Sequence, residues 1–134
     1  MKDLFLRIDR LSQQRGRHWE REGDHIRVTL REAGRSQTIH VSRDDDRYVF
    51  RSVVLPASQV TRDDEHWRRI AYRTWRRNAS KELVTFAFDS QDRLVGVIEV
   101  PASTLDRDEL DLYIETLAKE CDRFEYALTG EDAE

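Results

Sequence analysis

The chain of 134 residues is poor in the residues that define several protein classes, with one cysteine, two prolines and five glycines. A single cysteine excludes an internal disulfide framework, and so few glycines and prolines exclude a collagen-like or low-complexity chain. No apolar run reaches the roughly 18 residues of a membrane-spanning helix. The apolar stretch from Leu4 to Leu6 is flanked by charges and lacks the cleavage site of a secretory signal. We therefore expect a cytoplasmic protein without membrane contacts.

Motifs for nucleotide binding and catalysis are also missing from the sequence. There is no glycine-rich phosphate loop, and no serine stands in a Gly-x-Ser-x-Gly elbow. The four histidines (His18, His25, His40, His66) have no metal-ligand spacing with one another or with Cys121. His25 and His40 could face each other across a hairpin, where a weak metal site is the alternative to ordinary surface histidines. We predict no enzyme, no cofactor and no metal.

Charge is abundant but unevenly distributed. Charged residues make up 37% of the chain, and the net charge is −4. Residues 1–80 contain 18 basic against 12 acidic residues, whereas residues 81–134 contain 5 against 15. This asymmetry predicts a dipolar molecule that attracts an oppositely charged partner or a second copy of itself; the alternative is that both signs interleave on the folded surface.

The first half of the chain predicts one helix and three strands. Leu4, Ile8 and Leu11 form one apolar stripe of a helix from about residue 3 to residue 15, which Gly16 would end. Alternating apolar residues predict strands over 24–31 and 37–41, joined by a turn at Ala33-Gly34. The run 48–55 is apolar on both faces, which favours a central strand.

The second half predicts a helix over 63–78, two strands over 83–88 and 94–100, and a long final helix. Asp106 and Glu109 form an acidic capping box at the start of that helix, and Gly130 would end it. The order α-β-β-β-α-β-β-α predicts a single α+β domain over residues 1–130, with an antiparallel sheet packed against helices. Residues 131–134 would be an acidic tail.

The helix predicted over 63–78 has an unusual composition, with two tryptophans on one face and five arginines over the rest. One interpretation is that its apolar face packs on the sheet or on a partner and that its arginines meet carboxylates. The other is that the aromatic and basic side chains bind nucleic acid.

Residue-level likeness to a known family is concentrated in the second half of the chain. The matching segments are Leu83–Phe88 with Asp89, Leu94-Val95-Gly96, Val100-Pro101, Thr104–Leu110, Leu117-Ala118, Cys121-Asp122 and Leu128–Gly130. With the order of elements, they resemble the class I (CesT-like) type III secretion chaperones and the related YbjN-like domains of bacteria. The resemblance implies a small, often dimeric, non-enzymatic protein that binds extended segments of other proteins, and it carries over no catalytic residue.

These observations predict a peptide-binding, chaperone-like domain whose sheet edge accepts an extended segment of a partner protein. We expect a homodimer, with a self-association face formed by Trp67, Arg68, Ala71, Trp75 and Arg76. Trp19 would be either an exposed anchor for the partner or a cap on the core. The alternative function is a nucleic-acid-binding accessory protein that uses the helix rich in Arg and Trp.

Overall fold

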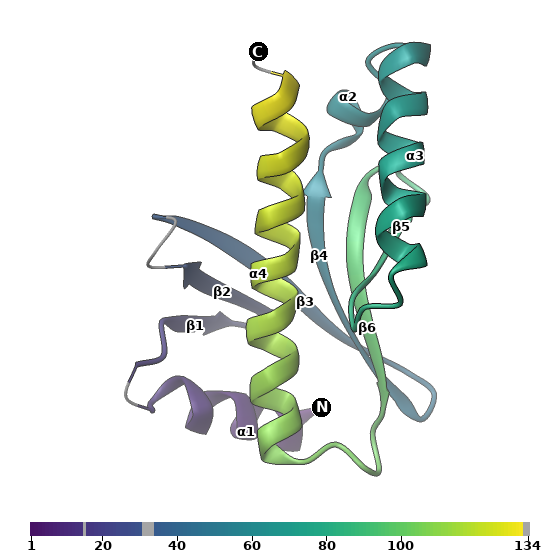
Figure 1. The fold of residues 1–134 in the computed structure, drawn as a ribbon. Coiled ribbons are helices and arrows are strands. Elements are labelled where there is room, and N and C mark those ends of the chain that lie inside the picture. Colours follow the sequence, from purple (N-terminus) through teal and green to yellow (C-terminus); the bar gives the residue numbers. More distant parts are fainter. Residues whose placement is uncertain (15, 31–33, 133–134) are drawn as a thin grey trace.

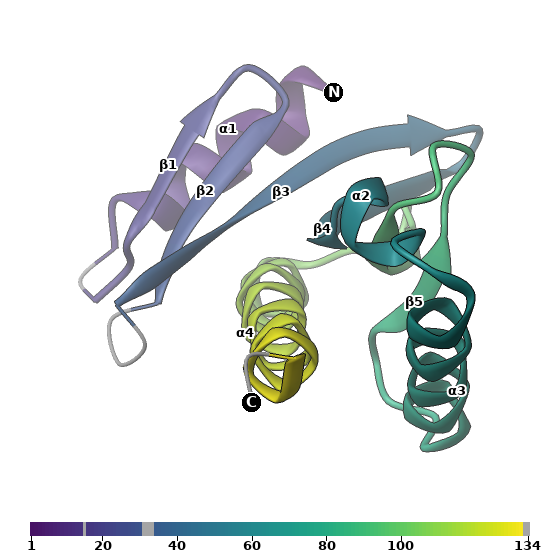
Figure 2. The same cartoon turned by 90° about the horizontal axis from the view of Figure 1, so that it is seen from above.

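A curved antiparallel sheet with helices packed against it forms the body of the molecule (Figures 1 and 2). The computed structural model describes residues 1–14, 16–30 and 34–132. In chain order the elements are α1 (Lys2–Ser12), β1 (Trp19–Glu22), β2 (His25–Leu30), β3 (Arg35–Asp44), β4 (Arg47–Leu55), α2 (Ala57–Val60), α3 (Asp64–Ala79), β5 (Thr85–Phe88), β6 (Leu94–Pro101) and α4 (Arg107–Asp132). The predicted α+β class is confirmed.

The six strands follow the order β1-β2-β3-β4-β6-β5, so that β1 and β5 are the two edges. Helix α4 crosses the middle of the sheet and contacts β2, β3, β4 and β6 (Figure 1). Helix α1 contacts both β1 and α4, while α3 lies along β5 (Figure 2). Strand β4 is central, as its two apolar faces predict, and Val49 and Phe50 are both buried although they point to opposite faces.

The core lies between α4 and the sheet face beneath it. The predicted stripe of α4 is buried along its whole length, at Leu110, Ile114, Leu117, Cys121, Phe124 and Leu128. Its predicted capping box is present, since Glu109 N donates to Asp106 Oδ1 at 2.8 Å and Asp106 N donates to Glu109 Oε1 at 3.2 Å. Gly96 of β6 lets the helix approach closely, because a Cβ at this position would overlap the Sγ of Cys121.

Several predicted boundaries are wrong. Helix α1 ends at Ser12, and α4 continues through Gly130 to Asp132, so Gly130 does not end it and residues 131 and 132 are not a separate tail. Strand β1 was not predicted, because only its first residue, Trp19, is apolar and an alternating pattern is missing. The short helix α2 follows Pro56 and was also not predicted. The predicted turn residue Ala33 and residues 133–134 lie outside the described part of the chain.

Candidate partner-binding surfaces

The β1 edge of the sheet presents unused backbone groups. A tight turn at Gly23, whose φ is +62°, joins β1 to β2. Along an antiparallel strand, residues that bond to the neighbouring strand alternate with residues whose N–H and C=O point away from it. Thr29 N donates to His18 O at 2.9 Å, so the N–H and C=O of Trp19 and Arg21 point away from β2. Within the described ranges, no residue supplies a hydrogen-bond partner for these outward groups. The β1 edge can therefore pair with another strand.

The β5 edge is partly closed by a side chain. Asp89 N donates to Arg93 O at 2.9 Å, so the same alternation turns the backbone groups of Phe86 and Phe88 outward. Asn78 of α3 takes both groups of Phe86: its Nδ2 donates to Phe86 O at 2.7 Å and its Oδ1 accepts from Phe86 N at 2.9 Å. The amide of Asn78 thus replaces a residue of a neighbouring strand at Phe86, and the two edges of the sheet differ.

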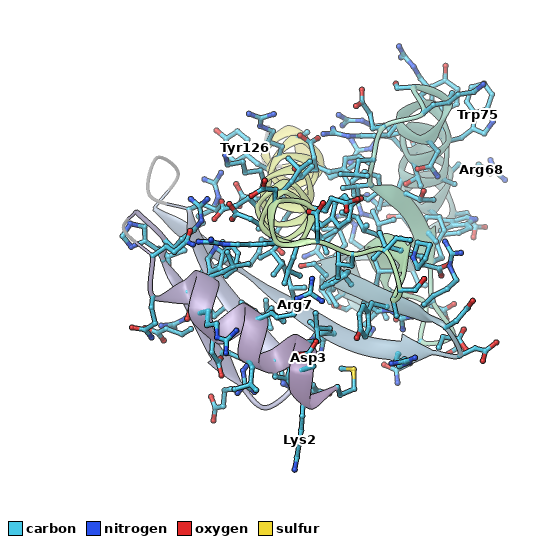
Figure 3. All side chains as sticks on the ribbon, turned by 90° about the horizontal axis from the view of Figure 1, so that it is seen from below. Lys2, Asp3, Arg7, Arg68, Trp75 and Tyr126 are labelled. Atoms are coloured by element: carbon cyan, nitrogen blue, oxygen red, sulfur yellow. The ribbon has the colours of Figure 1, made fainter. Side chains whose placement is uncertain are left out.

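The outer face of α3 is the second exposed surface, and we define it as Trp67, Arg68, Tyr72, Trp75 and Arg76. Trp75 is 66% exposed and its ring stacks on that of Tyr72, with centroids 6.2 Å apart. Trp67 is 40% exposed because one side of its ring packs edge-on against Phe88. Figure 3 shows Arg68 and Trp75 pointing away from α4 into solvent. Ala71, also predicted to belong to this face, is half-buried beside it.

Two arginines of α3 contact α4 and do not face solvent freely. Arg77 donates to Glu120 Oε2 at 3.2 Å, and its guanidinium lies 4.8 Å from the centre of the Phe124 ring. Arg73 donates to Ala127 O at 3.3 Å. The buried face of α3 is formed by His66, Ile70 and Thr74 rather than by the tryptophans. The expectation that the tryptophan stripe packs on the sheet is therefore wrong for Trp75, and fewer arginines remain available to a ligand.

Trp19 belongs to the core. The side chain is only 5% exposed, and its Nε1 donates to Glu115 Oε1 of α4 at 2.6 Å. Of the two alternatives for this residue, the core position is correct and the exposed anchor is wrong. The side chain fixes β1 to α4, while the backbone of the same residue remains at the open edge.

An open polar groove of about 540 Å³ lies between α4 and the adjacent ends of β2 and β3. Its carboxylates are already paired: Asp122 accepts two hydrogen bonds from Arg35, both at 2.8 Å, and Glu115 accepts from Trp19. Arg17 pairs with Asp111 at the same end, and this hydrogen bond raises the pKa of the guanidinium. These pairs hold α4 on the sheet.

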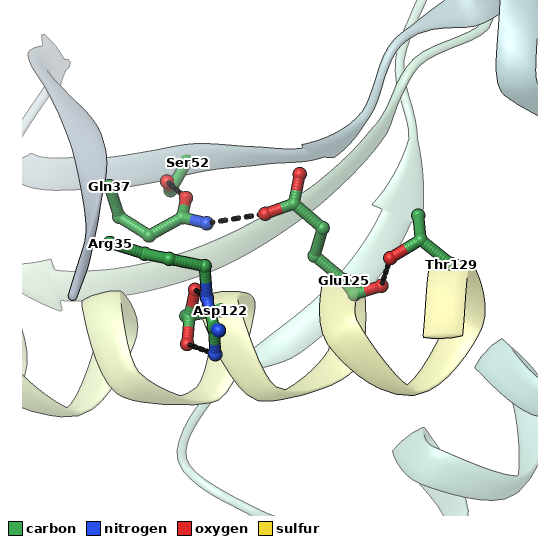
Figure 4. A network of polar contacts seen from close by, with 6 residues as sticks. All are labelled: Arg35, Gln37, Ser52, Asp122, Glu125 and Thr129. Atoms are coloured by element: carbon green, nitrogen blue, oxygen red, sulfur yellow. Dashed lines mark hydrogen bonds and ion pairs between the residues drawn. The ribbon is translucent and has the colours of Figure 1, made fainter. Parts of the chain in front are cut away.

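A buried polar network continues from this groove towards β4 (Figure 4). Gln37 Nε2 donates to Glu125 Oε1 at 3.3 Å, and Ser52 Oγ lies 2.9 Å from Gln37 Oε1. Burial raises the pKa of Glu125, and the negative charge of Asp122 raises it further. The network connects β3, β4 and α4 through side chains that are largely shielded from water. It specifies how the helix is placed along the strands.

His25 and His40 face each other across β2 and β3, as predicted, with ring centroids 4.2 Å apart. Burial lowers the pKa of His40, and the charge of His25 lowers it further. His25 Nδ1 lies 2.9 Å from Asp24 Oδ1. In the described part of the chain, no group of three or more His, Cys, Asp or Glu side chains is placed to hold a metal ion.

Cys121 is fully buried beneath Gly96, as its place on the apolar stripe predicts. Burial raises the pKa of the Cys121 thiol to about 12, so the group is neutral at pH 7. It fills space between helix and sheet.

Two features of these surfaces were not predicted from the sequence. The open edge was missed because β1 has a single inward apolar residue, Trp19, and its pairing with β2 is visible only in the fold. The role of Asn78 was missed because it depends on a contact with Phe86 across the gap between α3 and β5.

None of the helices in the described ranges has the length and apolar composition of a membrane span.

Comparison with known proteins identifies the fold. No protein-family model matches the chain, and no curated protein matches it. Among solved structures, the chain is similar to a chain in "Crystal Structure of the ExsC-ExsE Complex", with a TM-score of 0.60 over 95% of this chain and 94% of that one. The sequence identity is 12%, so the likeness shows the fold alone. The α+β architecture, with an antiparallel sheet packed against helices, is therefore shared with that chain.

Proposed function

We propose that this chain is a non-enzymatic, chaperone-like protein that binds an extended segment of a partner protein by adding it as a strand to β1. The fold supports this function, since the similar solved structure is named as a complex of two proteins. Strand addition supplies affinity through backbone hydrogen bonds, and neighbouring side chains supply specificity.

The observation that carries the proposal is the difference between the two edges of the sheet. The outward groups of Trp19 and Arg21 lack partners within the described ranges, whereas Asn78 occupies those of Phe86. An exposed edge favours association with other chains, and proteins usually protect such edges. Both outward residues of β1 are open, whereas one of the two on β5 is capped by Asn78, and this difference favours a binding role for β1.

The test is a pair of substitutions at one position of β1. A library of random 12-residue peptides is selected against the protein, and the affinity of the selected peptides is measured by fluorescence anisotropy. Arg21→Pro removes the outward N–H and is tolerated at an edge, so we expect Kd to rise about tenfold. The control Arg21→Ala removes the same side chain, with its hydrogen bonds to Asp9, but keeps the N–H, and it should bind within threefold of the original chain. Equal affinities for the two variants, or no selected peptide, would refute strand addition at β1.

We also propose that the outer face of α3 mediates self-association into a homodimer. A two-fold axis near Tyr72 would pair the α3 helices of two copies in antiparallel fashion. This arrangement sets Arg68 of one copy beside Trp75 of the other, where a cation–π contact is available. The exposed Glu65 in the first turn would approach the basic last turn of the second copy.

Light scattering tests the self-association. Trp75→Ala should convert a dimer into monomers, whereas Leu112→Ala, which shortens an exposed apolar side chain elsewhere, should not. A monomeric mass for the unmodified chain, or a dimer that survives Trp75→Ala combined with Trp67→Ala, would refute it.

A second candidate function is the binding of single-stranded nucleic acid by the same outer face. The stacked rings of Tyr72 and Trp75 beside exposed arginines favour it, because bases stack on such side chains. A labelled 20-nucleotide strand should then bind, weaken steeply as salt increases, and bind less to Trp75→Ala. No binding at low salt would exclude this function.

A further inference from the structure

The side chains of β1 restrict which segment fits its edge. Glu20 and Glu22 lie two residues apart on β1, so both point to the sheet face opposite α4. They border a shallow hollow of about 670 Å³ that is also lined by Arg27 and His25 of β2. Glu20 pairs with Arg27 at 2.9 Å, and Glu22 forms no ion pair with another described residue. The outer face of the edge therefore presents two exposed carboxylates, of which Glu20 is paired with Arg27 and Glu22 is not.

An added strand would place every second side chain opposite these carboxylates. Directly opposed side chains on neighbouring strands lie within reach of each other, and opposite charges favour the pairing over alanine by about 1.4- to fivefold per pair. Two pairs would give roughly a two- to twenty-five-fold preference for lysine or arginine over alanine, and a larger preference over glutamate, of about fourfold or more. Like charges opposite Glu20 and Glu22 would weaken the pairing by a similar factor.

The inner face of the edge is different, because α1 lies along β1 on that side (Figures 1 and 2). The guanidinium of Arg21 lies 4.8 Å from the centre of the half-buried Phe5 ring. Arg21 also donates to Asp9 at 2.6 and 2.9 Å, and this hydrogen bonding lowers the pKa of Asp9. The charge of Arg21 is thus satisfied within the molecule, and an inner side chain of the added strand would adjoin the Phe5 ring.

We propose that the segment bound at β1 alternates basic and apolar residues, with lysine or arginine opposite Glu20 and Glu22 and apolar side chains towards α1. The inference rests on the proposed function and specifies the chemistry of the partner. An alternative explanation is that the two carboxylates only protect the edge from association, in which case they should not select the charge of a bound strand.

The experiment compares two labelled peptides, Thr-Lys-Val-Lys-Val-Lys-Thr and its counterpart with glutamate in place of lysine, both capped at their ends. Binding is measured by anisotropy at 150 mM salt to the unmodified chain and to the double variant Glu20→Lys, Glu22→Lys. We expect the unmodified chain to prefer the lysine peptide at least fourfold and the double variant to prefer the glutamate peptide.

The matched control is Asp44→Lys with Asp46→Lys, which changes the net charge by the same amount. Asp44 ends β3 and Asp46 lies in the β3–β4 turn, far from β1 (Figure 1). The control variant should keep the preference for the lysine peptide. Binding without a charge preference, or a preference reversed equally by the control, overturns the inference and leaves strand addition standing. Binding of neither peptide to any of the proteins, or a lysine peptide that binds equally to Arg21→Pro and Arg21→Ala, overturns the proposed function as well.

Discussion

Replacing Gly96 by alanine tests the close packing of α4 on the sheet. The new Cβ would overlap the Sγ of Cys121 and would lie 3.1 Å from Val84 Cγ1 and 3.2 Å from Phe86 Cε1. All three neighbours are buried, so none can move into solvent. Overpacking of a core costs about 1–3 kcal/mol of unfolding free energy. The φ of Gly96 is not positive, so alanine itself would stabilise by about 0.4–1 kcal/mol through the unfolded chain.

The overpacking is the larger effect, so we expect Gly96→Ala to lower the unfolding free energy by roughly 1–2 kcal/mol and Tm by about 4–8 °C. Urea denaturation followed by circular dichroism measures the first quantity, and a thermal melt measures the second. The compensating change is Cys121→Ala, which removes the overlapping sulfur.

Alone, Cys121→Ala should cost about 1 kcal/mol for the space it leaves. In the double variant the methyl group added by Gly96→Ala occupies part of that space, so the two costs should not add. We expect a coupling of about 1–2 kcal/mol in favour of the double variant. Additive costs, or a Gly96→Ala chain that is more stable than the original, would show that α4 does not contact β6 at this point.

Three further predictions concern individual polar contacts. Trp19→Phe removes the hydrogen bond to Glu115 and should lower the unfolding free energy by about 2 kcal/mol in a urea melt, whereas Glu115→Gln, which keeps an acceptor, should cost less. Asn78→Ala should speed hydrogen exchange of the Phe86 amide at least about tenfold and promote concentration-dependent association. Asn78→Asp keeps the acceptor and should change the exchange rate less. An unchanged exchange rate in both variants would contradict the contact between Asn78 and Phe86. The pKa of His40 is lowered by burial and by the neighbouring imidazole, so the folded chain binds fewer protons than the unfolded chain. The contribution of neutral His40 to the unfolding free energy should then be complete above about pH 6.5 and should be lost as the pH falls through the lowered pKa of His40. Urea melts between pH 5 and 8 should show a smaller decline for His40→Gln, and an identical pH profile would contradict this assignment.

Sequence patterns predicted the parts of this fold that depend on local physics. The stripe of α4 and its capping box require only spacing along one helix, and both are present. Strand β4 was predicted to be central because both of its faces are apolar. Patterns failed where an element is short or takes its structure from a neighbour, as in β1, which is defined by its pairing with β2.

Helix α3 shows the same limit for a candidate site. Its arginines and tryptophans could be recognised from the sequence, but their directions could not. Which side is buried depends on where α4 and β5 lie, and the tertiary structure buries Ile70 while exposing Trp75 and turning Arg77 towards Glu120. The outer face of α3 is therefore smaller and less basic than the composition of the helix indicates.

Helical and strand periodicities place apolar side chains on one face without reference to other segments. For this reason they were enough to predict the α+β class, most of the order of elements and most of the core residues. The open edge of β1, and the contact of Asn78 with Phe86 at the edge of β5, became visible in the folded molecule. The physical reason is that backbone hydrogen bonding at an edge depends on which segments the fold brings alongside it, and no local pattern records that neighbour.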